Sequence, residues 1–420
     1  MGLFSEKPFN LLIIKEDESF IIKQNDLINN DFDLRDFLIG NYLDISLIDK
    51  LSDNNSLEDY LSKNNNYSSF KGLDGVEFNK LKKHYNLIDK KINSKEKVEL
   101  YYQYAYDKFL SKTKTDTNNT PYLYRPDGKI SKFIINKIDG YTNKKHIIND
   151  NFQRTRNHFI YEEENILLNL FGKKINAVFV KETFYFSNLL FGLKLEDKNY
   201  YYLFTAIINS KVIDYFLKQK HQKRFGSNFS YLNVSAIKEL PIPKELNNNT
   251  AFEISRISKN LTDKEYKYND EVQENLNELI FDLYDLSYLE RQRIKDYFLN
   301  KKAVTKSKNE IGNYIETLES SINIFLKKPV TFEEEHNTGL GLLAIKINLN
   351  DTSDTPSAKK TGLYLLNEIF EQNPQENFLA SREKIWGKDC IYIIKQDINT
   401  NWTKTKAYED GQEVLKKLMK

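Results

Sequence analysis

The sequence contains a single cysteine, Cys390, among its 420 residues. One thiol cannot form a disulfide within a chain, and it cannot supply the ligands of a cysteine-based zinc site. The five histidines are scattered along the sequence without the short spacing of metal ligands. These absences exclude a disulfide-stapled secreted scaffold, and they lead us to expect a protein of the reducing cytoplasm.

Long apolar runs and a strong excess of one charge are also missing. No window of about 18 uninterrupted apolar residues occurs, so the sequence predicts no membrane-spanning helix. Residues 1–10 lack a basic region followed by an apolar stretch, so we expect no secretory signal. The formal net charge is only +2. A nucleic-acid-binding face therefore has to come from local clustering of Lys and Arg.

The sequence does contain enough apolar side chains for packed cores, because 40% of its residues are hydrophobic. A chain of this length is expected to form about two to four domains. A polar run at 111–120 and an acidic run at 333–335 indicate boundaries. We predict a mixed α/β fold in four segments: an N-terminal α/β segment at 1–111, an α/β domain at 112–247, a helical region at 248–328, and a small α+β module at 329–420.

Hydrophobic periodicity predicts the elements within these segments. The expected strands lie at 9–14, 19–22, 340–349 and 390–395, with a helix or strand at 361–370. The expected helices lie at 76–110, over most of 252–326, and at 404–419.

The stretch from Tyr200 to Pro243 organises these expectations. Its first part predicts one amphipathic helix over 200–218, with Asn209-Ser210 as a polar step inside it. A loop with four cations and one glycine follows at 218–228. The stretch closes with L-P-I-P. Because proline lacks a backbone donor, we expect an edge strand or an extended turn there.

The order N-S-K at 209–211, basic loop, and L-P-I-P at 240–243 resembles the end of a target-recognition domain. Such domains occur in type I specificity subunits. They also occur, as the TaqI-like C-terminal specificity domain, in adenine-N6 DNA methyltransferases and type IIG restriction-modification enzymes. Upstream, AVFVK at 177–181 and FYF at 184–186 fit two strands of this family, and downstream 276–298 resembles its helix, turn and helix.

The resemblance covers residues 122–298. It implies an α/β domain that reads duplex DNA in a restriction-modification or related phage-defence system. The stretch at 34–49 resembles one that follows the catalytic motif of these methyltransferases, so a methyltransferase-lobe remnant remains one interpretation of segment 1–111.

The catalytic motifs of such enzymes are absent. An adenine-N6 methyltransferase needs a glycine-containing loop for S-adenosylmethionine and a [D/N]-P-P-[Y/F] motif for the flipped adenine. The nearest matches lack a third glycine at 339–341 and a second proline at 119–122. Glu383-Lys384 lacks the spacing of a metal-dependent nuclease motif. We therefore expect no catalysis by the chain alone and no cofactor on it, with S-adenosylmethionine bound by a partner chain.

Binding chemistry remains. Duplex DNA carries one negative charge per ~1.7 Å of its axis, so a reader needs clustered cations and some side chains that reach base edges. Residues 112–156 have a net charge of +6, and residues 211–244 have a net charge of +5. The candidate DNA-binding residues are Arg125, Lys129, Arg154, Arg156, Lys181, Lys220, Gln222, Lys223, Arg224 and Asn228.

A solvated surface charge is the simpler interpretation of each candidate taken alone. For residues 218–228 as a unit we favour DNA contact, because the loop is dense in donors and carries a glycine for close backbone approach. The aromatic residues at 184–186 and 200–202 are expected in the core, although aromatic rings can also stack on bases.

We therefore predict a specificity subunit, or the C-terminal part of a split adenine-N6 methyltransferase. Its expected partners are double-stranded DNA, a methyltransferase catalytic subunit, and a nuclease or translocase subunit. Two alternatives stay open. One is a nuclease within 329–420, and the other is an interaction protein unrelated to DNA whose helical region is the functional part.

Overall fold

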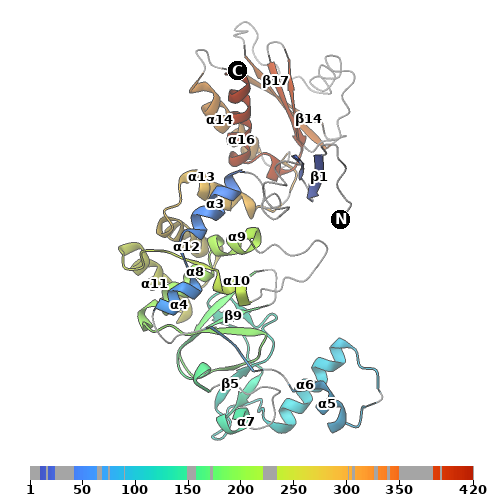
Figure 1. Ribbon diagram of the computed structural model, residues 1–420, viewed down its shortest axis with the longest axis vertical. Coiled ribbons are helices and arrows are strands. Elements are labelled where there is room, and N and C mark those ends of the chain that lie inside the picture. Colours follow the sequence, from blue (N-terminus) through green and yellow to red (C-terminus); the bar gives the residue numbers. More distant parts are fainter. Residues whose placement is uncertain are drawn as a thin grey trace. The chain divides into compact units, whose positions relative to one another are not determined.

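The computed structural model confirms the mixed α/β class (Figure 1). It describes residues 10–15, 18–23, 42–63, 69–73, 76–88, 90–148, 158–170, 174–220, 234–300, 302–304, 308–325, 330–337, 341–349, 382–387 and 390–419. The chain divides into two compact units. We call Ser46–Leu286 the central unit, and we call Met1–Ile45 together with Ser287–Lys420 the C-terminal unit.

The core of the central unit is an antiparallel sheet with the strand order β10-β9-β12-β4. Its strands are β4 (Ser69–Lys71), β9 (Asn165–Asn169), β10 (Ala177–Val180) and β12 (Leu190–Leu193). Every residue of β9, β10 and β12 is buried, which fits their nearly continuous apolar sequences.

A second sheet has the order β11-β5-β8, with β11 parallel to β5 and β5 antiparallel to β8. Its strands are β5 (Thr120–Leu123), β8 (Gly140–Thr142) and β11 (Tyr185–Phe186). The ring of Phe186 reaches over β12 of the first sheet, where a Cβ at Gly192 would lie 2.6 Å from Phe186 Cζ. Only glycine leaves room for this contact.

Two short strand pairs complete the central unit. They are β6 (Ile130–Ser131) with β7 (Ile134–Ile135), and β3 (Asn55–Ser56) with β13 (Pro241–Ile242). The expected edge strand at L-P-I-P is thereby confirmed. Both β3 and β4 precede residue 111, yet they pair with strands that follow it. The predicted boundary at 111 thus falls inside one compact unit.

Helices and short helical turns surround these sheets. They are α3 (Tyr42–Ser52), in which the unit boundary falls, α4 (Leu57–Lys63), α5 (Phe78–His84), α6 (Ser94–Lys108), α7 (Lys144–Ile148), η1 (His158–Ile160), η2 (Lys198–Tyr200), α8 (Tyr201–Ile208), α9 (Lys211–Lys220), α10 (Val234–Lys238), α11 (Asn249–Thr262) and α12 (Asp270–Leu283). Asparagine caps begin α6, α11 and α12.

Two expected helices are interrupted. The helix predicted at 76–110 is divided into α5 and α6, and the one predicted over 200–218 is divided into α8 and α9. The helices at 248–328 also fall into two groups. The pair α11 and α12 belongs to the central unit, whereas α13 (Tyr288–Tyr297) and α14 (Lys308–Asn323) belong to the C-terminal unit.

The C-terminal unit contains a four-stranded antiparallel sheet with the order β14-β15-β17-β16. Its strands are β14 (Thr331–Asn337), β15 (Leu342–Asn348), β16 (Arg382–Trp386) and β17 (Cys390–Gln396), and the hairpin of β1 (Asn10–Lys15) and β2 (Glu18–Lys23) lies in the same unit. The strands expected at 9–14, 19–22, 340–349 and 390–395 are confirmed. The segment at 361–370 lies outside the described residues.

The core of the C-terminal unit lies between this sheet and a helix pair. Ile391 and Ile393 of β17 pack with residues of α14 and α16 (Lys404–Leu418), which follows the short turn η4 (Asn399–Asn401). The alternate residues Tyr392 and Ile394 belong to a separate buried cluster, as the pleat of a strand requires. In the described part of the chain, none of the helices combines the length and apolar character needed to cross a membrane.

Candidate nucleic-acid interface

Asn209, in the N-S-K motif, connects α8 to the main sheet. Its side-chain oxygen accepts a hydrogen bond from the backbone N of Ala177, and its side-chain nitrogen donates to the Ala177 carbonyl, both at 2.8 Å. The amide side chain therefore pairs with β10 as a neighbouring strand would. Asn209 is fully buried, so it satisfies two backbone groups that water cannot reach. The motif residue is a structural joint.

The other two motif residues connect the next helix to α12. Ser210 Oγ accepts a hydrogen bond from Ile213 N at 3.3 Å in the first turn of α9. The backbone N of Lys211 donates to Asn277 Oδ1 at 3.0 Å, and its Nζ donates to Glu274 Oε2 at 2.6 Å. These contacts explain the division of the expected helix, because the polar step is used to bind β10 and α12.

Lys132 reaches the same joint from the turn between β6 and β7. Its Nζ donates to the Asn209 carbonyl at 2.5 Å and to Gln273 Oε1 at 3.3 Å. Gln273 Nε2 in turn donates to Asn277 Oδ1 at 3.1 Å. Burial lowers the pKa of Lys132 to about 8, and the nearby Asp214 opposes that shift. We call Lys132, Asn209, Gln273 and Asn277 the amide network.

The amide network fixes α9. The segment from the last turn of α9 to β13 carries the basic loop at 218–228, and we call this segment the basic stretch. Lys220 is the last residue of α9, and its Nζ lies 5.2 Å from the centre of the Phe216 ring. The same atom is 3.7 Å from Glu239 Oε2 and 3.4 Å from Ser52 Oγ. Lys220 is thus held on the surface by weak contacts that phosphate oxygens could replace.

The far end of the basic stretch is also fixed. The strand β13 pairs with β3, and Tyr284 OH donates to the Pro241 carbonyl at 2.6 Å. Residues 221–233, and with them Gln222, Lys223, Arg224 and Asn228, lie outside the described residues. The residues that flank this segment, Lys220 and Val234, both belong to the central unit.

The other described candidates have acidic partners within the central unit. The Arg125 Nη2 atom lies 3.0 Å from Asp127 Oδ2, and Lys181 Nζ lies 2.6 Å from Asp263 Oδ1. The side chains of Arg125 and Lys181 are 41% and 49% exposed. Such surface pairs are weak, so they leave both cations able to turn toward a phosphate.

Lys129 is different, because its side chain is only 19% exposed. Its Nζ forms an ion pair with Asp139 and donates to Tyr102 OH at 3.0 Å. Asp139 also accepts a hydrogen bond from the backbone N of Tyr124 at 2.7 Å. Removing Lys129 would leave a nearly buried carboxylate without its cation, so this residue has a structural role in the central unit.

Four of the six aromatic residues at 184–186 and 200–202 lie in the core, as expected, whereas Tyr200 and Tyr202 are only half-buried. Phe184, Tyr185, Phe186 and Tyr201 are all at most 6% exposed. The ring of Tyr201 stacks on Phe179 with their centroids 4.8 Å apart. Buried rings of this kind are not available to stack on bases.

Sequence reasoning missed a polar chain around His158. Its Nδ1 lies 2.5 Å from Glu162 Oε1, and its Nε2 lies 2.6 Å from Tyr185 OH. The hydrogen bond with His158 lowers the pKa of Glu162, and burial raises the pKa of Tyr185 to about 12. The spacing of His158 and Glu162 by four residues was the available signal.

The position of the His158 side chain matters for two further candidate residues. Arg154 and Arg156 lie outside the described residues, a few residues before His158. The hydrogen bonds of His158 fix the first described residue after 149–157.

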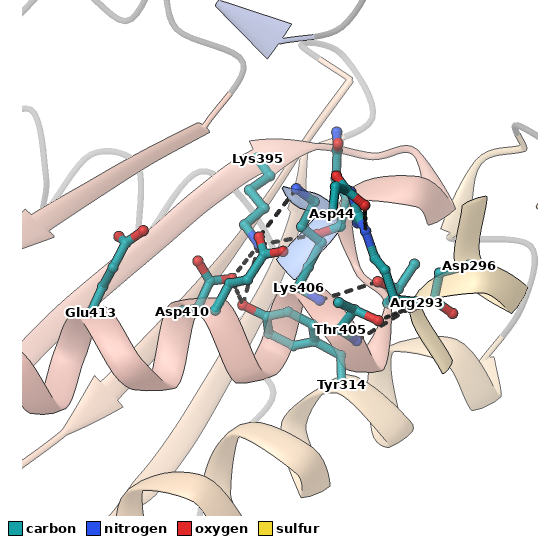
Figure 2. A network of polar contacts seen from close by, with 12 residues as sticks. Asp44, Arg293, Asp296, Tyr314, Lys395, Thr405, Lys406, Asp410 and Glu413 are labelled. Carbon is teal, nitrogen blue, oxygen red and sulfur yellow. Dashed lines mark hydrogen bonds and ion pairs between the residues drawn. The ribbon is translucent and has the colours of Figure 1, made fainter. Parts of the chain in front are cut away.

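A second polar network lies in the C-terminal unit, where Figure 2 shows Lys395 and Tyr314 directed at Asp410. Asp410 is completely buried, and its carboxylate pairs with Lys395 Nζ and accepts a hydrogen bond from Tyr314 OH. Lys384 Nζ lies 2.8 Å from the other carboxylate oxygen and also pairs with the exposed Glu413. We call these five residues the charged network.

The same unit has two further cross-links in Figure 2. Arg293 forms a bidentate pair with Asp44, with N–O distances of 2.6 Å and 2.5 Å. Asp296 of α13 accepts a hydrogen bond from Thr405 Oγ1 at 2.6 Å, which fixes the start of α16. These groups bind one another, so the arrangement is that of internal fastening. No set of three or more His, Cys, Asp or Glu side chains within the described ranges is placed to hold a metal ion.

The comparison with solved structures finds a similarity of low degree. No family model matches the sequence, and no curated protein matches it. One similar solved structure is described as "Characterization and crystal structure of the type IIG restriction endonuclease BpuSI", with a TM-score of 0.29 and 11% sequence identity. The match covers 64% of this chain and 36% of that one. The match thus spans just over a third of the length of that neighbour.

Proposed function

We propose that this protein is the DNA target-recognition component of a restriction-modification system. It binds duplex DNA and supplies the choice of sequence. A separate methyltransferase chain supplies S-adenosylmethionine and the catalytic motif, because the sequence carries neither the cofactor loop nor the adenine-binding motif. The sequence resemblance at N-S-K and L-P-I-P is the starting point of this proposal.

One structural observation carries the proposal further. The two motifs that bear the resemblance secure the two ends of the basic stretch, through Asn209 with β10 and through β13 with β3. Binding residues are typically found on loops that a rigid scaffold positions. We therefore assign the contacts of a DNA reader to this donor-rich segment, in which cations would fix the register and a few side chains would reach the bases.

The test is a variant of the full chain in which Lys220, Lys223 and Arg224 are replaced by alanine. A preferred sequence is first selected from a pool of random duplexes. Affinity for this duplex and for random DNA is then measured across a salt series. If all three side chains touch phosphate, the slope of log K against log salt should shrink by about 2.7, since each contact contributes about 0.9.

A base contact would give a different signature. Loss of a side chain that reads a guanine edge should cost about 1–3 kcal/mol on the selected duplex and little on random DNA. The matched control replaces Lys259, Lys264 and Lys267, three exposed cations of the same unit, and should leave both quantities unchanged. A folded loop variant with the salt slope and preference of the wild type would move the recognition surface to Arg125 and residues 149–157.

A further inference from the structure

The helices α5 and α6 form an arm that Figure 1 shows projecting from the sheets of the central unit. We call residues 78–108 the helical arm. Its root is the second half of α6. There the ring of Tyr101 stacks on that of Tyr124 with their centroids 3.8 Å apart, and the hydroxyl oxygens of Tyr101 and Tyr122 share a hydrogen bond of 2.7 Å. Ala105 and Phe109 are buried in the same cluster. The arm is thus anchored rigidly at one end.

The other end of the arm is strongly basic. Residues 80–97 contain seven lysines and two acidic residues, a net charge of +5 in a chain whose total is +2. Two of these lysines pack on the Phe78 ring, with Lys82 and Lys97 Nζ at 5.7 Å and 4.7 Å from its centre. Lys83, Lys90, Lys91 and Lys95 are exposed.

These four lysines differ from the candidate cations identified in the sequence. Arg125, Lys129, Lys181 and Lys220 each have a carboxylate of their own chain within 4 Å. Among the described residues, no side chain forms an ion pair with Lys83, Lys90, Lys91 or Lys95. Like charges close together in the sequence repel one another, and a bound polyanion would remove that repulsion.

The chemistry of the arm favours nucleic acid over a protein partner. Lysine is depleted at the cores of protein interfaces, whereas it binds phosphate as a flexible point charge. The arm exposes one large hydrophobic side chain, Ile88 at 63%, among its described residues. It has seven lysines and no arginine between residues 80 and 97, so the bidentate fork that most often reads guanine is missing.

We propose that the helical arm binds the phosphate backbone of the duplex DNA that this protein recognises. This proposal rests on the proposed function, because it assigns a second contact to the same DNA. The arm adds affinity without adding sequence choice. Its rigid aromatic root positions the lysines relative to the central unit, so the arm also fixes the register of the duplex.

The test uses the full chain with Lys83→Gln, Lys90→Gln and Lys91→Gln combined. The three side chains make no core contact, so far-UV circular dichroism should match the wild type. The salt slope should fall by up to about 2.7 if all three touch phosphate. Affinity should fall by the same factor on selected and random duplexes. The corresponding Lys→Arg triple variant keeps the charges and should keep the slope.

Four outcomes decide the matter. A lower slope with unchanged sequence preference supports the arm, provided that glutamine at Lys259, Lys264 and Lys267 has no such effect. If the wild type binds duplex DNA and the Lys→Gln variant has the same salt slope, the contact between the arm and DNA is refuted and the proposed function stays in place. A Lys→Gln variant that loses sequence preference but keeps the salt slope also refutes the phosphate contact, because the arm would then read bases. A wild type that binds no duplex overturns both.

Discussion

The amide network of the central unit and the charged network of the C-terminal unit join helices to a sheet by different chemistry. In the central unit, Asn209 pairs with the backbone of β10, and Gln273 and Asn277 continue the bonds along α12. In the C-terminal unit, the completely buried Asp410 binds Lys395, which extends from β17. One joint relies mainly on neutral amides, and the other on opposite charges.

The difference decides what each joint costs when it is broken. An amide taken out of water needs only its hydrogen bonds replaced, so losing one partner exposes a dipole. A buried ion needs its counter-ion, because transfer of a lone charge to the interior is far more costly. Lys395 has further partners, since its Nζ lies 4.9 Å and 5.1 Å from the rings of Tyr314 and Trp402. Those rings attract a cation but do not neutralise it.

The largest effect is therefore expected for Asp410→Asn. The substitution keeps the shape of the side chain and leaves Lys395 buried without a counter-charge. We expect a loss of about 3–5 kcal/mol of stability in the C-terminal unit. Both tryptophans of the chain, Trp386 and Trp402, lie in this unit. Their fluorescence during urea unfolding therefore reports on it selectively.

Two companions sharpen this experiment. Glu413→Gln removes a partner of Lys384 whose side chain is 56% exposed, so the loss of stability should be less than about 1 kcal/mol. Combining Asp410→Asn with Lys395→Met removes both buried charges and should recover part of the loss. A loss below 1 kcal/mol in the single variant would mean that water reaches Lys395.

The amide network should respond less strongly. Asn209→Ala leaves the backbone N of Ala177 without its side-chain acceptor, whereas the Ala177 carbonyl keeps the hydrogen bond from Phe133 N, so we expect a loss of about 1–3 kcal/mol in the central unit. Faster hydrogen exchange at the Ala177 amide would report the break directly. Asn209→Asp keeps the acceptor and loses the donor, so it should protect that amide better than alanine does. Unchanged exchange in Asn209→Ala would show that the pairing contributes little.

The sequence predicted the elements better than their partners. Periodicity located β1, β2, β15, β17 and α16, because each follows a local apolar pattern. It predicted a single helix across Asn209, since the apolar spacing continues through both halves. The partner that ends α8 is Ala177, 32 residues away, and no local pattern contains that information.

The burial of charged residues was equally hard to predict from the sequence. Lys395 follows a run of apolar strand residues and looks like the end of a strand reaching solvent. It is buried because Asp410 and Tyr314 meet it from two helices, 15 and 81 residues away in sequence. The pairing of β4 with β12 spans more than a hundred residues and joined segments that composition had separated. The N-S-K motif itself was found, but its structural role required the fold.

A further effect, which pH reverses, concerns Lys132, the one cation of the amide network. Its folded pKa of about 8 lies below the 10.5 of an unperturbed lysine, so the unfolded chain binds this proton more tightly. Charged Lys132 therefore lowers stability below pH 8, and that cost disappears as the pH rises toward 10.5.

Lys132→Met removes the titrating group at all pH values. The stability of the wild type relative to this variant should therefore rise between pH 7.5 and 10, by about 2 kcal/mol, since each pKa unit is worth about 1.36 kcal/mol. Urea unfolding followed by far-UV circular dichroism, with the tryptophan-reported transition analysed separately, measures this difference. Lys259→Met replaces an exposed lysine of the same unit and should differ from the wild type by a constant amount. A constant difference for Lys132→Met as well would mean that Lys132 titrates like a surface lysine, and that hydrogen bonds from the Asn209 carbonyl and Gln273 offset its burial.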